Sequence, residues 1–301
     1  MSIQITRVFH GMSWRVAACA LAVMAHIAPS WSQAPAPSQA QSLGPHQPQS
    51  LSLDSQLQRI IDDPQAQDRP RYIFIGAALN TREPVFDADV RLVHSVLSER
   101  LGTAYRAVLL SNTESPPAQG AWPLASVENL HRAITTLAEH RRAGDRYIVL
   151  LTTHGGPGIL EVHQPRIYPG AVYLQSDQLA VWVNTLAPQP TWLVLSACYV
   201  GSHLPVLAEQ GQRALLTMAA ASADRPSFGC DPQGDYTWFT AAFVEALSTQ
   251  SSIQEVWDST KRLVSQRERS MKMRPSRPQW QVGADWKAWL GKPWVQLGGE
   301  R

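Results

Sequence analysis

Two apolar runs that end in reactive side chains place the strongest constraint on the fold of this chain. The first, YIVLLTTHGG, covers residues 147–156, and the second, TWLVLSACYVGS, covers residues 191–202. Both are rich in leucine and β-branched residues over the length of a strand, as expected for strands buried on both faces of a parallel sheet. His154 ends the first run and Cys198 the second. Since open α/β sheets bind ligands at the carboxyl ends of their strands, the pattern indicates a Cys–His site there.

Strand-like runs alternate with helix-like segments along the rest of the chain. Further strands are expected at residues 72–78, 105–111, 213–221 and 278–284, the last at an edge. Helices are expected at residues 85–102, 125–144, 176–187, 236–247 and 253–269. Residues 158–174 contain two short β-rich pieces around a Pro-Gly turn, which predicts a hairpin directly after the His154 loop. This order predicts an α/β fold with a mostly parallel sheet and helices on both faces.

The amino-terminal segment has the pattern of an export signal. Arg7 and Arg15 precede an apolar run at residues 16–28, and Ser30 and Ser32 place small residues where a signal peptidase needs them. The run is shorter than the roughly 20 residues that span a bilayer, so we expect cleavage after Ser32 and no stable membrane insertion afterwards. The protein is therefore expected to be periplasmic or secreted.

The segment that follows differs in composition from the rest of the chain. Residues 33–52 are rich in Pro, Gln, Ser and Ala with almost no charge, which predicts a disordered leader. Strand-like and helix-like segments fill the chain after it. We therefore expect a signal peptide at 1–32, the leader at 33–52 and one folded domain at 53–301.

Charge and cysteine usage narrow the function classes. The net charge of +2 is too small to imply a nucleic-acid partner, and we expect none. The histidines near the motifs lack the spacing of a metal site, and we expect neither a metal nor a cofactor. Signal cleavage would remove Cys19 and leave Cys198 and Cys230 in an oxidising compartment. Composition alone leaves two alternatives open there, a structural disulfide or a catalytic thiol.

Three segments together resemble a known family. LLTTHGGPGIL (150–160), LVLSACYVGS (193–202) and AAASADRPSFGCDPQGDYTWF (219–239) are similar to the legumain-type (C13) cysteine peptidases in their bacterial form, within the caspase/legumain-like clan. The resemblance spans about residues 72–247, with His and Cys at the ends of consecutive strands. It implies a caspase-like three-layer sandwich.

The resemblance also implies catalytic roles. Cys198 would be the nucleophile, and His154 would protonate the leaving amine. The backbone N–H groups of Gly155 and Cys198 would stabilise the oxyanion, and a glycine at this position lets the substrate chain approach closely.

Substrate-binding roles follow from the same resemblance. Asn80 and Arg82 match the family's Asn-x-Arg after the first strand, whose Asn orients the catalytic His and whose Arg lines the specificity pocket. The family has an acidic residue two positions before the nucleophile, where this chain has Ser196, which puts asparagine or aspartate selectivity in doubt. We expect Arg82, Ser196, Ser222 and Asp231 to build the pocket.

These observations predict an exported cysteine endopeptidase or transpeptidase that acts on a peptide or protein through Cys198 and His154. Two alternatives remain open. One is a non-catalytic binding module in which Cys198 is idle or disulfide-paired with Cys230, and the other is a hydrolase of non-peptide esters or amides. The sequence leaves the oligomeric state unknown.

Overall fold

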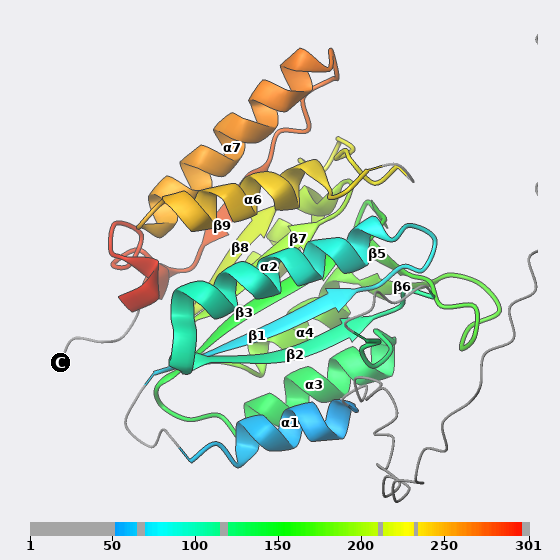
Figure 1. Ribbon diagram of the computed structural model, residues 1–301. Coiled ribbons are helices and arrows are strands. Elements are labelled where there is room, and N and C mark those ends of the chain that lie inside the picture. The colour runs from blue at the N-terminus through cyan, green and yellow to red at the C-terminus, as the bar shows by residue number, and fades with distance from the viewer. Residues whose placement is uncertain (1–51, 65–69, 115–119, 210–212, 232–233, 297–301) are drawn as a thin grey trace, which may run out of the picture. The chain divides into compact units, whose positions relative to one another are not determined.

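A computed structural model describes residues 52–64, 70–114, 120–209, 213–231 and 234–296 (Figure 1). The predicted signal peptide and all but the last residue of the predicted leader lie outside the described residues. None of the helices in the described part of the chain combines the length and apolar character that a membrane crossing requires.

The largest sheet in the described residues has six strands in the order β2-β1-β3-β7-β8-β9 (Figure 1). Neighbouring strands from β2 to β8 are parallel, and β9 pairs antiparallel with β8. The sheet is therefore mostly parallel, as predicted, and the segment expected at an edge forms the edge strand β9. The strands are β1 (Arg71–Ala78), β2 (Tyr105–Ser111), β3 (Asp145–Thr152), β7 (Thr191–Ser196), β8 (Leu215–Ala219) and β9 (Gln279–Val282).

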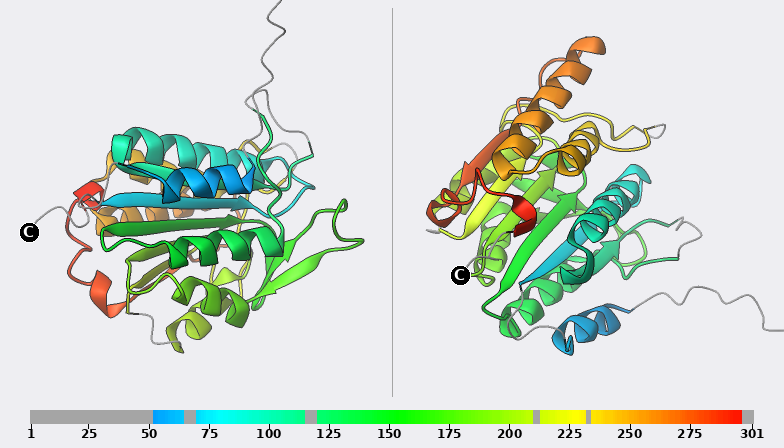
Figure 2. Two further views of the ribbon diagram at one scale, coloured as in Figure 1. Left: turned by 90° about the horizontal axis from the view of Figure 1, so that it is seen from below. Right: turned by 60° about the vertical axis from the view of Figure 1, so that its left-hand side comes forward.

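Helices cover both faces of this sheet, which confirms the three-layer α/β sandwich. Helices α2, α6 and α7 pack together on one face, and α1, α3 and α4 pack on the other (Figures 1 and 2). Short 3₁₀ turns occur at Gly102–Ala104, Val200–His203, Ala284–Trp286 and Trp294–Gln296. The α-helices are α1 (Leu53–Ile61), α2 (Val85–Leu101), α3 (Val127–Glu139), α4 (Ser176–Asn184), α5 (Leu204–Glu209), α6 (Trp238–Thr249) and α7 (Ile253–Ser270).

The core lies between the sheet and its two helix layers. Every residue of β1, β7 and β8 is buried, because a strand covered on both faces has no solvent side on which to place polar residues. On α2 the buried residues Phe86, Val90, Val93 and Leu97 recur at helical spacing and face the sheet. Burial of this apolar surface is the main force that holds the strand ends in place.

A second, smaller sheet follows the His154 loop. It consists of β4 (Gly155–Gly156), β5 (Ile159–Val162) and β6 (Val172–Gln175), paired antiparallel in that order. The predicted hairpin is thus confirmed, and it projects beyond the carboxyl end of β1 (Figure 1).

Helix α1 is absent from the elements predicted above. Its buried residues Leu53, Leu57 and Ile60 recur at helical spacing, and the Ser52 hydroxyl caps it by accepting a hydrogen bond from the Ser55 N–H at 3.1 Å. The segment is short and directly follows the Pro- and Gln-rich stretch, so its apolar stripe is easily overlooked in the sequence.

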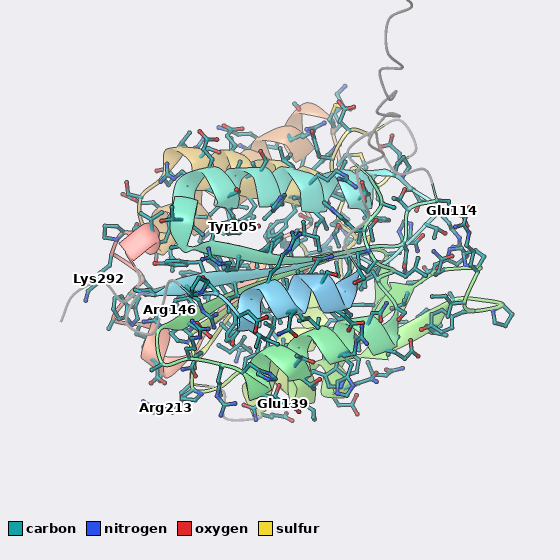
Figure 3. The ribbon with its side chains drawn as sticks, turned by 60° about the horizontal axis from the view of Figure 1, so that its bottom comes forward. Tyr105, Glu114, Glu139, Arg146, Arg213 and Lys292 are labelled. Atoms are coloured by element: carbon teal, nitrogen blue, oxygen red, sulfur yellow. The ribbon has the colours of Figure 1, made fainter. Side chains whose placement is uncertain are left out.

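The two ends of the sheet differ chemically. At the amino ends of β1 and β3, the Arg71 guanidinium donates two hydrogen bonds of 2.8 Å to the Asp145 carboxylate, with both side chains almost fully buried. Figure 3 shows Arg146 and Arg213 near this end and Glu114, which follows β2, on the side of the β5–β6 hairpin. The amino end is therefore held by a structural ion pair, whereas the candidate site lies at the carboxyl end.

Candidate active site

Cys198 lies two residues beyond the end of β7, at the carboxyl edge of the sheet. Tyr199 has a φ of 59°, in the left-handed region, so the chain turns sharply before the 3₁₀ turn at Val200–His203. The Ser227 N–H donates a hydrogen bond to the Cys198 Sγ at 3.3 Å, and the thiol lies 3.6 Å from the Ser227 carbonyl oxygen. These two contacts fix the position of the sulfur. Cys198 is partly exposed and is a free cysteine.

His154 lies two residues beyond the end of β3, the strand that neighbours β7. Its Nε2 is 2.8 Å from the Glu83 Oε2, and the two side chains are 28% and 16% exposed. The Phe86 ring packs edge-on against the imidazole at 5.1 Å between centroids. The carboxylate and the aromatic ring together hold the imidazole in one orientation. Because Glu83 contacts Nε2, Nδ1 is the ring nitrogen left to exchange a proton with a substrate.

The loops that carry His154 and Cys198 lie directly against each other. The Thr153 N–H donates a hydrogen bond to the Ser196 carbonyl at 3.2 Å. A Cβ atom at Gly155 would lie 2.6 Å from the Cys198 carbonyl oxygen, closer than real Cβ atoms come to a backbone oxygen. Only glycine therefore fits this position without a shift of the backbone, and the structure brings the predicted residues His154, Gly155 and Cys198 together.

The Gly155 amide points away from the hairpin strand that it pairs with. The Glu161 N–H donates to the His154 carbonyl at 2.9 Å, so His154 and Glu161 form a hydrogen-bonded pair. Gly155 and Leu160 are the next pair in this antiparallel register and belong to the alternate, non-hydrogen-bonded kind. The Gly155 N–H is thus not used by β5, as its predicted role as an oxyanion donor requires.

Cys230 lies close enough to the site to interact with it electrostatically. Burial above all, with smaller contributions from the neighbouring Cys198 and Glu83, raises the pKa of its thiol to about 11. Both cysteines are free, so the structure contains no disulfide between Cys198 and Cys230. At neutral pH Cys230 is therefore a protonated, poorly nucleophilic thiol beside Cys198.

Asn80 does not make the contact with His154 that the resemblance implies. It is buried two residues beyond the end of β1, where its Oδ1 accepts a hydrogen bond from the Arg82 N–H at 2.9 Å and its Nδ2 has no hydrogen-bond partner. Glu83 contacts the His154 ring instead. The predicted contact between Asn80 and His154 is therefore absent, because the Asx-type turn uses the Asn80 side-chain oxygen to hold its own loop. Glu83 was not predicted as a site residue from the sequence, although it lies only three residues after Asn80.

The expected pocket residues differ in exposure. The Arg82 side chain is 54% exposed and its Nη1 lies 3.2 Å from the Glu161 Oε1 on β5. Asp231 is exposed, in the loop that follows Cys230. Arg82 thus has Glu161 as its acidic neighbour, a residue that the sequence did not single out.

The prediction that Ser196 helps to build the specificity pocket is wrong, because a buried side chain cannot line an open pocket. It is 1% exposed, and its hydroxyl lies 3.0 Å from the Thr237 hydroxyl and 2.9 Å from that of Thr240. As the last residue of β7, it points inward beneath the site rather than toward substrate. Ser222 is also buried, and its hydroxyl donates to the Asp224 carboxylate at 2.7 Å.

Two other histidines near the motifs have structural partners. The His203 Nδ1 lies 2.9 Å from the Ser176 hydroxyl, and burial lowers the pKa of His203 to about 4, so the ring is neutral at neutral pH. The His163 Nδ1 lies 2.7 Å from the Thr81 hydroxyl. Within the described ranges, no group of three or more metal-ligating side chains occurs.

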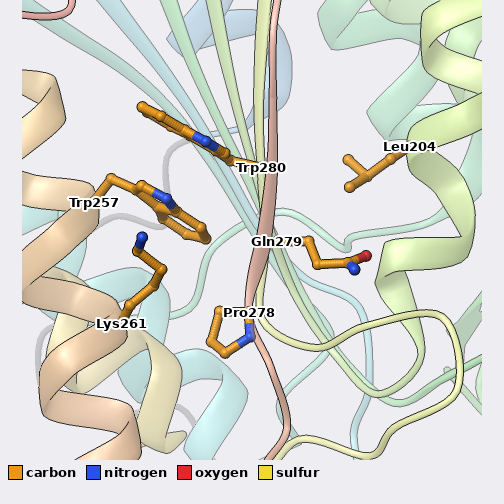
Figure 4. A pocket seen from close by; sticks show the side chains of 6 residues that line it. All are labelled: Leu204, Trp257, Lys261, Pro278, Gln279 and Trp280. Atoms are coloured by element: carbon orange, nitrogen blue, oxygen red, sulfur yellow. The ribbon is translucent and has the colours of Figure 1, made fainter.

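A hollow elsewhere on the molecule contains none of the predicted site residues. It has a volume of about 400 Å³ and lies where the α7 side chains Trp257 and Lys261 meet β9 (Figure 4). Trp257 stacks on Trp280 with 5.3 Å between ring centroids. Its remaining lining residues are Leu204, Pro278 and Gln279.

A comparison with models of known protein families identifies the family of this chain. The model of the Peptidase C13 family matches residues 133–285, just over half of the 301 residues. The chain therefore belongs to the Peptidase C13 family. Membership indicates a cysteine peptidase that acts on protein. The matched span contains His154 and Cys198 but not Glu83.

One solved structure with a similar chain is that of protein GSU0716 from Geobacter sulfurreducens. It is 14% identical to this chain, with a TM-score of 0.49, and the alignment covers 75% of this chain and 98% of that one. No curated protein matches the sequence.

Proposed function

We propose that this chain is an exported cysteine endopeptidase that cleaves peptides or proteins through Cys198 and His154. The observation that carries the proposal is the close approach of the two loops: a Cβ at Gly155 would lie 2.6 Å from the Cys198 carbonyl oxygen. In a member of the C13 family, this approach places a thiol, an imidazole and an unused backbone N–H at one sheet edge.

The reaction follows from these groups. His154 takes the proton of the Cys198 thiol as the sulfur attacks the carbonyl carbon of the scissile bond, and the N–H groups of Gly155 and Cys198 stabilise the oxyanion. When the C–N bond breaks, His154 donates a proton to the leaving amine and a thioester remains. Water then attacks the thioester, the C–S bond breaks, and the thiol and a free carboxylic acid are formed. If an amine attacks in place of water, the same thioester gives transpeptidation.

Glu83 acts in this scheme as the orienting partner of the catalytic histidine. Its Oε2 lies 2.8 Å from the His154 Nε2, and Phe86 packs against the same ring. A histidine held in this way loses little freedom when the substrate binds, which favours proton transfer.

The specificity pocket is proposed to contain Arg82 and Asp231, with Glu161 as the counter-charge of Arg82. The forked guanidinium favours a side chain that accepts hydrogen bonds, which asparagine and aspartate share. Because Glu161 already lies 3.2 Å from Arg82, an aspartate substrate adds a second carboxylate and asparagine is the better fit. Peptides varied at this one position, profiled near pH 5 and pH 7.5, test the pocket, and a preference for lysine, arginine or bulky apolar residues would refute it.

Export is part of the proposal and is supported by the sequence pattern of residues 1–32. The mature protein is proposed to be periplasmic or secreted. Amino-terminal sequencing of protein recovered from the periplasm or medium tests this, with a first residue at position 33 as the expected result.

The experiment that tests catalysis compares Cys198→Ala with Cys230→Ser. Cys198→Ala should abolish peptide cleavage and labelling by a thiol-directed electrophile, whereas Cys230→Ser should retain both. Cleavage by Cys198→Ala at the unmodified rate would refute the proposal, whereas no cleavage of any peptide by the unmodified protein would favour a non-catalytic binding module. Turnover of esters with no turnover of peptides would instead favour the non-peptide hydrolase.

A further inference from the structure

A fully buried carboxylate connects the two strands that lead to the catalytic residues. Asp89 lies on α2 and is 0% exposed. Its Oδ2 accepts hydrogen bonds from the Thr152 hydroxyl at 2.8 Å and from the Thr237 hydroxyl at 2.7 Å. Its Oδ1 accepts a third from the Thr237 N–H at 3.0 Å. Asp89 thereby joins α2, the last residue of β3 and the residue that caps α6.

The connection extends to β7 through hydroxyl groups. The Ser196 hydroxyl lies 3.0 Å from that of Thr237, and the Thr240 hydroxyl donates to Ser196 at 2.9 Å. With Asp89 ionised, these hydroxyls can all donate in one direction, from Thr240 to Ser196, then Thr237, then Asp89. Such an aligned chain of hydrogen bonds is stronger than its separate members.

Both strand ends are held at the same level of the sheet. Thr152 and Ser196 are direct partners in the β3–β7 register. Thr152 lies two residues before His154, and Ser196 lies two residues before Cys198. A shift of either strand end relative to the other would change the spacing between the imidazole and the thiol.

We propose that Asp89 is a positioning residue: it holds the ends of β3 and β7 together and so sets the distance between His154 and Cys198. The inference rests on the proposed function, because it concerns the alignment of those two catalytic groups. Asp89 has no direct part in the chemistry, since a fully buried side chain cannot contact the substrate.

The energetics support a functional reason for this carboxylate. Burial raises the pKa of Asp89 to about 7, against the hydrogen bonds from Thr237 and Thr152 that lower it. A buried charge destabilises the fold relative to a well-packed apolar side chain, so stability alone gives no reason to place one here. A fixed spacing between the strands that lead to His154 and Cys198 does give a reason for a buried carboxylate at this position.

The test uses two pairs of variants in the full-length protein. Asp89→Asn removes the charge with little change of shape, and its control, Asp87→Asn, changes an acidic residue of the same helix that pairs with Arg91. Thr152→Val removes the hydroxyl that donates to Asp89, and its control, Thr152→Ser, retains a hydroxyl. For each variant, kcat and KM are measured on a peptide substrate and normalised to the folded fraction. The rate of Cys198 alkylation by iodoacetamide is measured by mass spectrometry.

We expect Asp89→Asn and Thr152→Val to lower kcat about tenfold or more with KM within about twofold, because misaligned catalytic groups slow chemistry without weakening binding. Both variants should also slow Cys198 alkylation, and both controls should behave as the unmodified protein. An unchanged kcat in Asp89→Asn, or an equal loss in Asp87→Asn, overturns the inference. If the unmodified protein cleaves no peptide, the proposed function fails by itself, and the alkylation rates then decide: equal rates in Asp89→Asn and unmodified protein overturn the positioning role.

Discussion

Replacing Asp89 by asparagine should change how folding stability depends on pH. In the folded protein burial raises the pKa of this carboxyl from 3.8 to about 7. The folded state therefore retains the proton over a pH range in which the unfolded chain has released it. Stability falls with rising pH wherever the unfolded state binds fewer protons than the folded state. Below about pH 4 both states are protonated and Asp89 contributes no such penalty, and above about pH 7 the penalty is complete.

The size of the effect follows from the difference between a pKa of 3.8 for Asp89 in the unfolded chain and of about 7 in the folded protein. Each unit corresponds to about 1.4 kcal/mol, so the penalty grows to about 4 kcal/mol between about pH 4 and pH 7. Asparagine does not titrate, so this slope is absent in the variant. The free energy of unfolding of Asp89→Asn should therefore rise relative to that of the unmodified protein as pH increases, by about 1.4 kcal/mol per pH unit.

Urea unfolding of both proteins at several pH values between about 4.5 and 8 measures the difference. Other titrating groups occur in both proteins and cancel, and the hydrogen bonds that asparagine loses add only a constant offset. Parallel stability curves over this range would refute the reasoning, because they would mean that Asp89 titrates equally in the folded and unfolded states. Together with the expected loss of kcat, a gain in stability at neutral pH would show that the carboxylate lowers stability and serves alignment.

Two further predictions concern the site itself. His154→Ala should lower kcat about a hundredfold or more, which is the range of a positioned acid or base, whereas His163→Ala and His203→Ala should change kcat far less. Peptide cleavage by the three variants, measured side by side, tests this prediction. A larger loss of kcat in His203→Ala than in His154→Ala would assign the acid–base role to His203. Burial raises the pKa of Cys230 to about 11, so Cys230 should resist iodoacetamide at neutral pH while Cys198 reacts. The labelling rate of Cys230 should then increase about tenfold per pH unit as pH rises. Equal labelling of both cysteines at neutral pH, measured by mass spectrometry, would contradict the prediction.

The sheet, the positions of the two reactive residues and the family could all be predicted from the amino-acid sequence. Buried parallel strands are continuous apolar runs, which are local patterns that can be read without the tertiary structure. His154 and Cys198 follow such runs directly, so their place at the carboxyl edge of neighbouring strands was predictable. The β5–β6 hairpin was predictable for the same reason, from its turn residues.

The side chains that surround these two residues could not be predicted from local sequence and became known from the three-dimensional fold. Glu83 reaches His154 across 71 positions of the chain, and Asp89 reaches Thr237 across 148. No local pattern specifies such pairs, because they depend on how α2 packs on the sheet. The direction of a side chain at a strand end could not be predicted from the sequence either, because a residue two positions before Cys198 can face the substrate or the core. Hydrogen bonding with Thr237 and Thr240 turns the Ser196 hydroxyl into the core.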